Sequence, residues 1–279
     1  MPPYEPTARA LGLTKPGRAL TGVMVGLGAI WLMFAIAVNW GGATEDLFLL
    51  FCGNTERILH GEVWRLFTAP LMHQPSGTVS HILFAILGLL FLAPALEEKW
   101  GAARFLRFLF LSAVIAYGFQ MLLEVVLPAS LSRRLVGEYW FGSFPVLEAI
   151  AIAWALSFKG QSVRLWFVLP VSSSGMVIFI VAMSLLRVVA QAAEPEGLLS
   201  PFGGMLAGWL LGGSTPSPLR RAYLRLRLAQ LDREAARGTR AAAARRKDSP
   251  LRVIEGGRGG PNPPEGDGGK SSGGGRLLH

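Results

Sequence analysis

The chain has 279 residues, of which 51% are hydrophobic and only 16% are charged, and its formal net charge is +9. Soluble domains carry roughly 25% charged residues, and most charges here lie outside long apolar runs, so an ordinary soluble domain is excluded. The single cysteine, Cys52, excludes an intrachain disulfide framework and argues against a cysteine-based metal site.

Six apolar stretches are candidate membrane spans. A helix needs about 20 mostly apolar residues to cross the hydrocarbon core. Five stretches approach that length. The sixth is shorter, and its glycines recur at spacings that permit close packing of helices; a re-entrant turn is the alternative for it. The predicted spans are residues 20–40, 79–97, 105–127, 140–158, 175–193 and 200–213.

The sequence predicts four parts. Residues 1–19 form an N-terminal segment, and residues 20–214 form an all-α membrane domain. Leucines recur at helical spacing among arginines in residues 215–250, which predicts a basic amphipathic helix that binds anionic lipid headgroups. No nucleic-acid-binding motif accompanies these arginines, so nucleic acid is not an expected partner. Residues 251–279 are rich in Gly and Pro and are expected to be disordered.

The distribution of Lys and Arg predicts the orientation, because these residues concentrate on the cytoplasmic side of membrane proteins. Six spans place both ends of the chain on one side, and most of the 27 Lys and Arg residues fall there. We therefore expect both termini in the cytoplasm, at a bacterial cytoplasmic membrane, and the segment 41–78 outside, partly in the membrane face. The basic residues on the outer side are Arg57, Arg65, Arg133, Arg134 and Arg187.

A series of short motifs runs through the apolar part of the chain. Its members are Glu62, Trp64 and Arg65 after the first span, His73, His81 at the head of the second span, Glu97 and Gly101 at its end, and Gly203, Gly204 and Gly208 in the last span. In this order and spacing they resemble the rhomboid family of intramembrane serine proteases. The resemblance covers residues 20–214 and implies a bundle of six transmembrane helices with a membrane-associated outer loop after the first helix.

The chain departs from the family pattern at the catalytic positions. The family's second-helix histidine is followed four residues later by an asparagine, where this chain has Ala85. The family's Gly-x-Ser-Gly motif corresponds here to Gly142, Ser143, Phe144 and Pro145, which places Phe144 at the position of the nucleophile. Pro201 stands at the position of the base histidine.

These departures predict that the family's catalytic residues are missing. A serine hydroxyl is a weak nucleophile until a positioned base takes its proton, and neither phenylalanine nor proline can play these parts. The only histidine after His81 is His279, the last residue of the tail. The resemblance then implies a pseudoprotease that binds the transmembrane segments of client proteins and influences their fate. No cofactor and no metal are expected.

A divergent protease is the first alternative, with Ser143 as nucleophile and His81 as base. A shift of one residue along a helix turns the side chain by about 100°, which weighs against this pairing. Serine before a proline in the first turn is also typical of a helix N-cap, so we expect Ser143 to cap the fourth membrane helix.

The second alternative to a pseudoprotease depends on a charged residue within a predicted membrane span. Glu148 lies inside the predicted span 140–158, and a carboxylate within a membrane is a functional candidate whose partner must be named. Arg187 is one candidate partner, and Gln120 and Glu124 are the others. A structural pair, a client-binding group and a proton-linked carrier remain open. Carriers are commonly built from internal repeats, and none is evident between residues 20–127 and 140–214.

Overall fold

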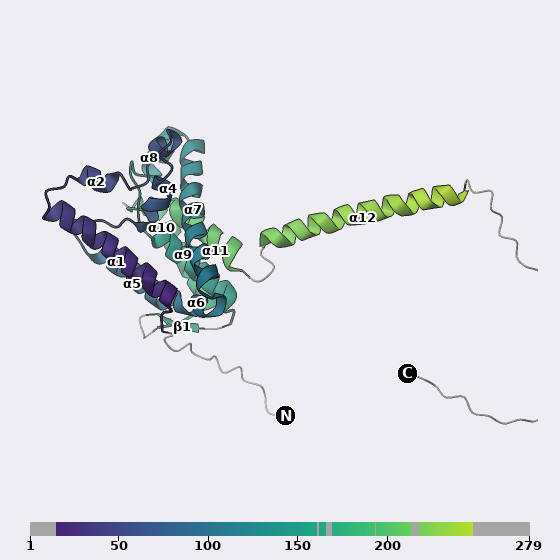
Figure 1. Ribbon diagram of the computed structural model, residues 1–279, viewed down its shortest axis with the longest axis horizontal. Helices are drawn as coiled ribbons and strands as arrows, with labels where there is room; N and C mark the ends of the chain where they lie inside the picture. The colour runs from purple at the N-terminus through teal and green to yellow at the C-terminus, as the bar shows by residue number, and fades with distance from the viewer. Residues whose placement is uncertain (1–14, 161, 166–168, 193, 214–217, 248–279) are drawn as a thin grey trace, which may run out of the picture. The chain divides into compact units, whose positions relative to one another are not determined.

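The computed structural model describes residues 15–247 apart from 161, 166–168, 193 and 214–217. The predicted disordered segment 251–279 and the first part of the predicted segment 1–19 lie outside the described residues. The chain divides into two units, Met1–Leu226 and Arg227–His279. Membrane helices, outer loop and candidate site all belong to the first unit, whose helices are drawn in Figure 1.

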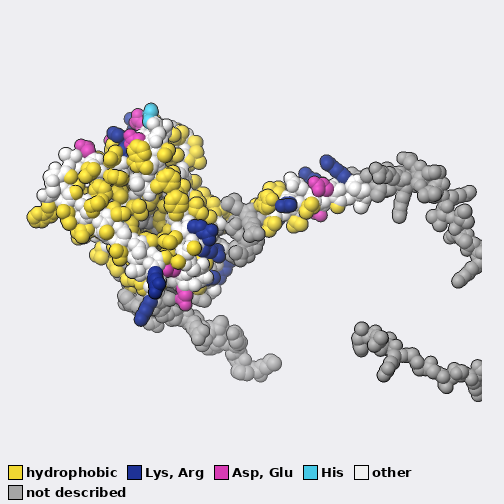
Figure 2. Space-filling model, viewed as in Figure 1, with side chains coloured by type: hydrophobic (Ala, Val, Ile, Leu, Met, Phe, Trp, Pro, Cys, Tyr) yellow, Lys and Arg dark blue, Asp and Glu magenta, His cyan; other side chains and the backbone are white. Residues whose placement is uncertain are grey.

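Three helices are long and apolar enough to cross a membrane: α1 (Arg18–Asn39), α7 (Ala102–Val126) and α10 (Ser173–Ala190). A fourth crossing is possible if α5 (Ser80–Leu92) and α6 (Pro94–Trp100), which meet at a 47° bend, count as one span. The bend falls at Pro94, which has no backbone N–H to continue the helical hydrogen bonding. Hydrophobic side chains cover much of the surface of this unit (Figure 2). The protein is therefore an integral membrane protein with several spans.

Two shorter helices pack inside this frame. In α9 (Phe144–Ser157) most side chains are buried, and α11 (Ser200–Gly212) packs closely against both α9 and α7. A side chain at Gly204 would collide with the carbonyl of Pro145, and one at Gly208 with the carbonyl of Ala149. The glycines allow the two backbones to touch. The sixth apolar stretch is thus a helix rather than a re-entrant turn.

The segment between α1 and α5, called the outer segment after its predicted position, folds around one arginine. It contains α2 (Glu45–Leu49), α3 (Thr55–Leu59), α4 (Arg65–Thr68) and the 3₁₀ helix η1 (Ala69–Leu71). Arg65 is buried, and its Nη1 donates to the carbonyls of Leu49 at 2.5 Å and Cys52 at 2.8 Å. Its Nε pairs with Glu62 at 2.6 Å. Arg65 of the Glu-x-Trp-Arg motif therefore connects the start of α4 to the end of α2 and to the turn that follows it.

The side-chain carboxylate of Glu97 caps the N-terminus of α1. Glu97 on α6 is buried and accepts hydrogen bonds from the backbone N–H groups of Ala19 at 3.0 Å and Leu20 at 3.3 Å. The N-terminal N–H groups of a helix lack intrahelical partners and favour a negative charge. Glu97 thereby fixes α1 beside α5 and α6, and α1 and α5 run side by side in Figure 1.

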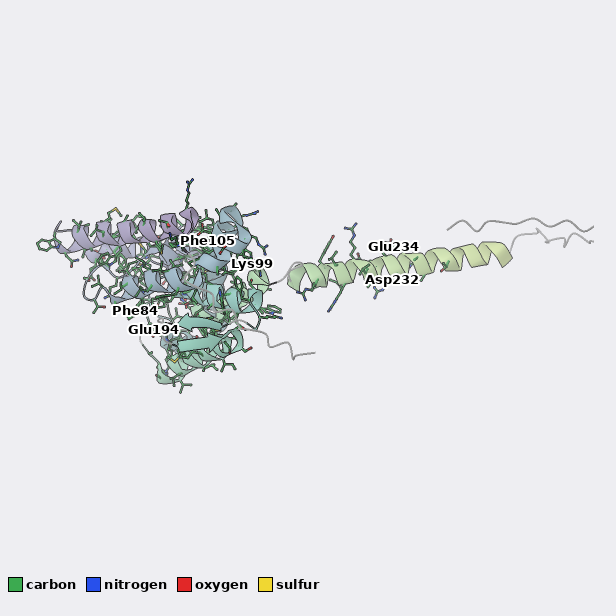
Figure 3. The ribbon with its side chains drawn as sticks, turned by 90° about the horizontal axis from the view of Figure 1, so that it is seen from below. Phe84, Lys99, Phe105, Glu194, Asp232 and Glu234 are labelled. Carbon is green, nitrogen blue, oxygen red and sulfur yellow. The ribbon has the colours of Figure 1, made fainter. Side chains whose placement is uncertain are left out.

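Four remaining elements complete the described fold. Helix α8 (Ala129–Leu135) follows α7. Strands β1 (Ser162–Leu165) and β2 (Leu169–Ser172) form an antiparallel hairpin between α9 and α10, with Ser162 opposite Ser172. The described residues are otherwise mainly helical, so the predicted all-α fold class is confirmed and the short hairpin is an addition to it. The described side chains of helix α12 (Pro218–Lys247), among them Asp232 and Glu234, are exposed (Figure 3); its binding to anionic lipid stays a prediction.

Candidate functional site

The turn before α9 is held in place by neighbouring elements. The backbone N–H of Gly142 donates to the carbonyl of Ala69 at 3.0 Å, and the Tyr117 hydroxyl donates to the carbonyl of Gly142 at 2.6 Å. Gly142 has φ +126°, a conformation that favours glycine. These contacts fix the direction of the next side chain, Ser143.

Ser143 is hydrogen bonded to a histidine of the outer segment. Its Oγ lies 3.1 Å from Nε2 of His73, and both side chains are buried. Ser143 occupies the N-cap position of α9, but its side chain makes no capping hydrogen bond. The predicted N-cap position is therefore confirmed, without the capping hydrogen bond from the side chain. The alternative with a divergent protease pairs Ser143 with His81, but the imidazole beside Ser143 belongs to His73.

The protonation of His73 follows from its surroundings. Nδ1 of His73 lies 3.3 Å from the carbonyl of Leu71, which can only accept, so Nδ1 carries the hydrogen and Nε2 is free to accept the Ser143 hydroxyl hydrogen. Burial, and secondly the nearby His81, lower the pKa of His73 from 6.5 to about 3. The imidazole is thus neutral at physiological pH.

His81 forms a second polar contact next to the first. Its Nε2 lies 2.8 Å from Oε1 of Glu196, a buried residue in the connection between α10 and α11. The His73 and His81 rings are 4.9 Å apart. The carboxylate also lies so close to Gly142 that a side chain there would collide with it. Sequence reasoning missed Glu196, although an acidic residue just before an apolar helix in a chain with few charges was a usable signal.

A family model for the Rhomboid domain matches residues 60–215, which is more than half of the chain. The chain belongs to the rhomboid family. No curated protein matches it. The match contains both histidines, Ser143 and Glu196, so the geometry described above can be compared with the positions where rhomboid proteases carry their catalytic groups.

At the positions that the sequence predicts for these groups, this rhomboid has apolar side chains. The Phe144 ring stacks on His81, with centroids 5.3 Å apart and planes 14° from parallel. Pro201, in the first turn of α11, lines one small cavity together with Phe144 and Glu196. Ala85 is fully buried on α5. The two positions expected for nucleophile and base therefore face the same space, and neither side chain there can move a proton.

Glu148 has a different partner from the one expected. Oε1 of Glu148 accepts a hydrogen bond from the Ser184 hydroxyl on α10 at 3.3 Å. Oε2 is buried and has no partner among the described residues. Arg187 instead forms an ion pair with Glu194 at 3.5 Å. The expected Glu148–Arg187 pair is not formed, and Glu148 joins α9 to α10 through a serine.

The described residues offer no group of three or more His, Cys, Asp or Glu side chains placed to hold a metal ion. Cys52 is buried and free, and burial raises the pKa of its thiol well above the usual range. The chemistry of the site is therefore that of two histidines, one serine and one carboxylate.

Proposed function

We propose that this rhomboid is a pseudoprotease that binds the transmembrane segments of client proteins. The observation that supports the proposal is the Phe144 ring stacked on His81 with Pro201 lining the same cavity. The family's reactive serine and its base are expected at these two positions, and a serine needs a positioned base in order to react. Phenylalanine and proline supply neither group, which argues against peptide cleavage by the family's mechanism.

The proposal includes six crossings of the membrane with both termini in the cytoplasm. Helices α9 and α11 are shorter than a full span, but α9 packs against α5, α7 and α10, and α11 packs against α7 and α9. Their unequal length is compatible with a position inside the bundle, where protein replaces lipid around the helix ends. The excess of Lys and Arg on the same side as the termini supports the orientation.

The face between α5 and α10 is the proposed position of the client helix. Both helices pack on α9 but make few contacts with each other. Large apolar side chains on each are exposed, such as Leu83 on α5 and Phe179 on α10. A client helix can cover such side chains through close van der Waals packing, which drives the association of helices in membranes.

Photo-crosslinking in native membranes tests the binding. A photoreactive phenylalanine analogue replaces Leu83 or Phe179, and the control replaces Leu32, an equally exposed residue on α1. We expect discrete crosslinks to membrane proteins from the α5 and α10 positions and only lipid or diffuse products from Leu32. Crosslinking of equal yield and pattern at all three positions would contradict a client site between α5 and α10.

A cleavage assay tests the loss of proteolysis. The purified full-length protein, reconstituted in liposomes with a single-span model substrate, should release no peptide product. Cleavage that disappears when Phe144 or Ser143 is changed to Ala would overturn the assignment as a pseudoprotease.

A further inference from the structure

An apolar cavity borders the start of α9, and its lining residues include none from α10. It is half open, has a volume of about 320 Å³ and is bordered by α1, α4, η1, α5, α7 and α9, within the size range of small-molecule sites. Ser143 is the one polar side chain among its lining residues. Ser143 therefore lies at the wall of a half-open cavity whose other lining side chains are apolar. Typical members of the lining are Leu27, Phe67, Leu89, Leu109 and Val114.

The lining decides which carbonyl compounds can enter. A peptide brings an N–H group with every carbonyl, and a buried N–H without an acceptor is unfavourable. The apolar walls offer no acceptors for a series of such groups. A long-chain acyl ester has no hydrogen-bond donor, and its methylene chain matches the walls. The cavity thus favours an acyl ester over a peptide.

Ser143 is equipped for reaction with such an ester. Its hydroxyl donates to Nε2 of His73, whose other nitrogen is fixed by the Leu71 carbonyl. A nucleophile in hydrogen-bond contact with an oriented base is the signature of nucleophilic catalysis. The backbone N–H groups of Ser143 and Phe144 donate to no acceptor among the described residues. They lie at the N-terminus of α9, where negative charge is stabilised.

We propose that Ser143, with His73 as its base, accepts the acyl group of a long-chain ester whose chain occupies this cavity. The Ser143 oxygen bonds to the ester carbonyl carbon while its proton moves to Nε2 of His73. The carbon–oxygen bond to the alcohol then breaks, and His73 returns that proton to the departing alkoxide. Water adds to the acyl-serine in the same way, so that a fatty acid leaves and the Ser143 hydroxyl is restored.

This inference is independent of the proposed function. It concerns the cavity between α1, α5, α7 and α9, whereas the client site lies between α5 and α10. It predicts turnover of esters and none of peptide bonds. The crosslinking experiment and the experiment below can therefore fail separately.

Covalent labelling of the detergent-solubilised full-length protein tests the reactive serine. A dodecyl fluorophosphonate should modify Ser143, as read by mass spectrometry of the digested protein, and Ser143→Ala should abolish labelling. The matched control is Ser112→Ala, because Ser112 is a buried serine of α7 with no hydrogen-bond partner among the described residues. His73→Gln should slow labelling about 100-fold, the lower end of the usual effect of a general base. An unlabelled Ser143 in the folded wild-type protein overturns the proposal.

Chain-length preference tests the cavity. The wild-type protein should hydrolyse p-nitrophenyl laurate faster than p-nitrophenyl butyrate. Val114→Phe, which places a ring in the cavity, should lower the laurate rate at least tenfold and leave the butyrate rate nearly unchanged. Val125→Phe is the control, because Val125 is an exposed residue of the same helix outside the lining. Equal loss with both esters in Val114→Phe, or no preference in the wild type, excludes the cavity as the acyl site.

Discussion

The hydroxyl of Ser143 lies 3.1 Å from Nε2 of His73, although 70 residues separate the two in the sequence. His81, the other histidine of the site, is occupied by the Glu196 carboxylate at 2.8 Å. The two imidazoles are thus assigned to different partners. The arrangement gives Ser143 a neutral acceptor, while the ring of His81 is stacked against Phe144.

The pH dependence of Ser143 labelling follows from the pKa of His73. The histidine accepts the serine proton only when it is neutral, and its pKa is lowered to about 3 by burial and by His81. We expect a rate of labelling by dodecyl fluorophosphonate that is constant from about pH 8 to pH 5 and falls as the pH approaches about 3. A fall with a midpoint near the ordinary histidine value of about 6.5 would contradict a buried, neutral base.

The same pKa affects stability. Between about pH 6.5 and pH 3 the unfolded chain takes up a proton at His73 that the folded chain does not, so the free energy of unfolding decreases as the pH falls through this range. His73→Gln removes the titrating group and should flatten this part of the profile. Thermal melting in detergent at several pH values measures the difference between wild type and variant, and identical pH profiles would count against the assignment.

Arg65→Met should destabilise the protein strongly. The substitution leaves the Leu49 and Cys52 carbonyls without their donor and Glu62 without its closest cation. Removal of one partner from a buried charged cluster costs about 3–5 kcal/mol. Thermal unfolding followed by circular dichroism gives the change.

The control for Arg65 is Arg57→Met. Arg57 pairs with the same Glu62 at 3.7 Å, but half of its side chain is exposed. Exposed ion pairs contribute about 0–1 kcal/mol, so this variant should melt close to the wild type. Similar losses in both variants would mean that the carbonyl contacts of Arg65 contribute little.

Gly204→Ala tests the contact between α11 and α9. The added methyl group would collide with the Pro145 carbonyl, and overpacking of this kind costs about 1–3 kcal/mol. Gly26→Ala on α1 is the matched control, because no atom lies within 4 Å of the position of its Cβ. Alanine favours helix over glycine by roughly 0.5–1 kcal/mol, so the control should be neutral or stabilising. Melting temperatures in the opposite order would refute the close packing.

The helices of the membrane part were predictable because each is encoded by a local apolar run. The close packing of α11 against α9 was also predictable, since Gly204 and Gly208 recur at the four-residue spacing of helix contacts. The hairpin β1–β2 carries no such signal, because its strands are only four residues long. A run of four residues does not distinguish a strand from a loop.

The contacts of the site could not be read from the sequence in the same way. Residue spacing identified His73 and His81 as members of one motif series, but their partners come from distant segments, Ser143 and Glu196. Which imidazole meets which partner depends on the fold of the outer segment and on the connection after α10. For Glu148 the prediction named the right helix but the wrong residue, because Ser184 and Arg187 both lie on α10 and the sequence does not show which of them faces Glu148.

Restoration of the family's catalytic residues tests the pseudoprotease proposal from the opposite direction. In a Ser143→Ala background, Phe144→Ser combined with Pro201→His should produce measurable cleavage of a single-span model substrate, because the two positions line one cavity. Either substitution alone should produce none, since nucleophile and base act as a unit. The rate should stay about 10²–10³-fold below that of a complete site, because Ala85 supplies no oxyanion donor. Phe144→Ala with Pro201→His is the inactive control. If the restored protein folds but cleaves nothing, residues 144 and 201 do not occupy the positions of nucleophile and base, and the loss of proteolysis needs another cause.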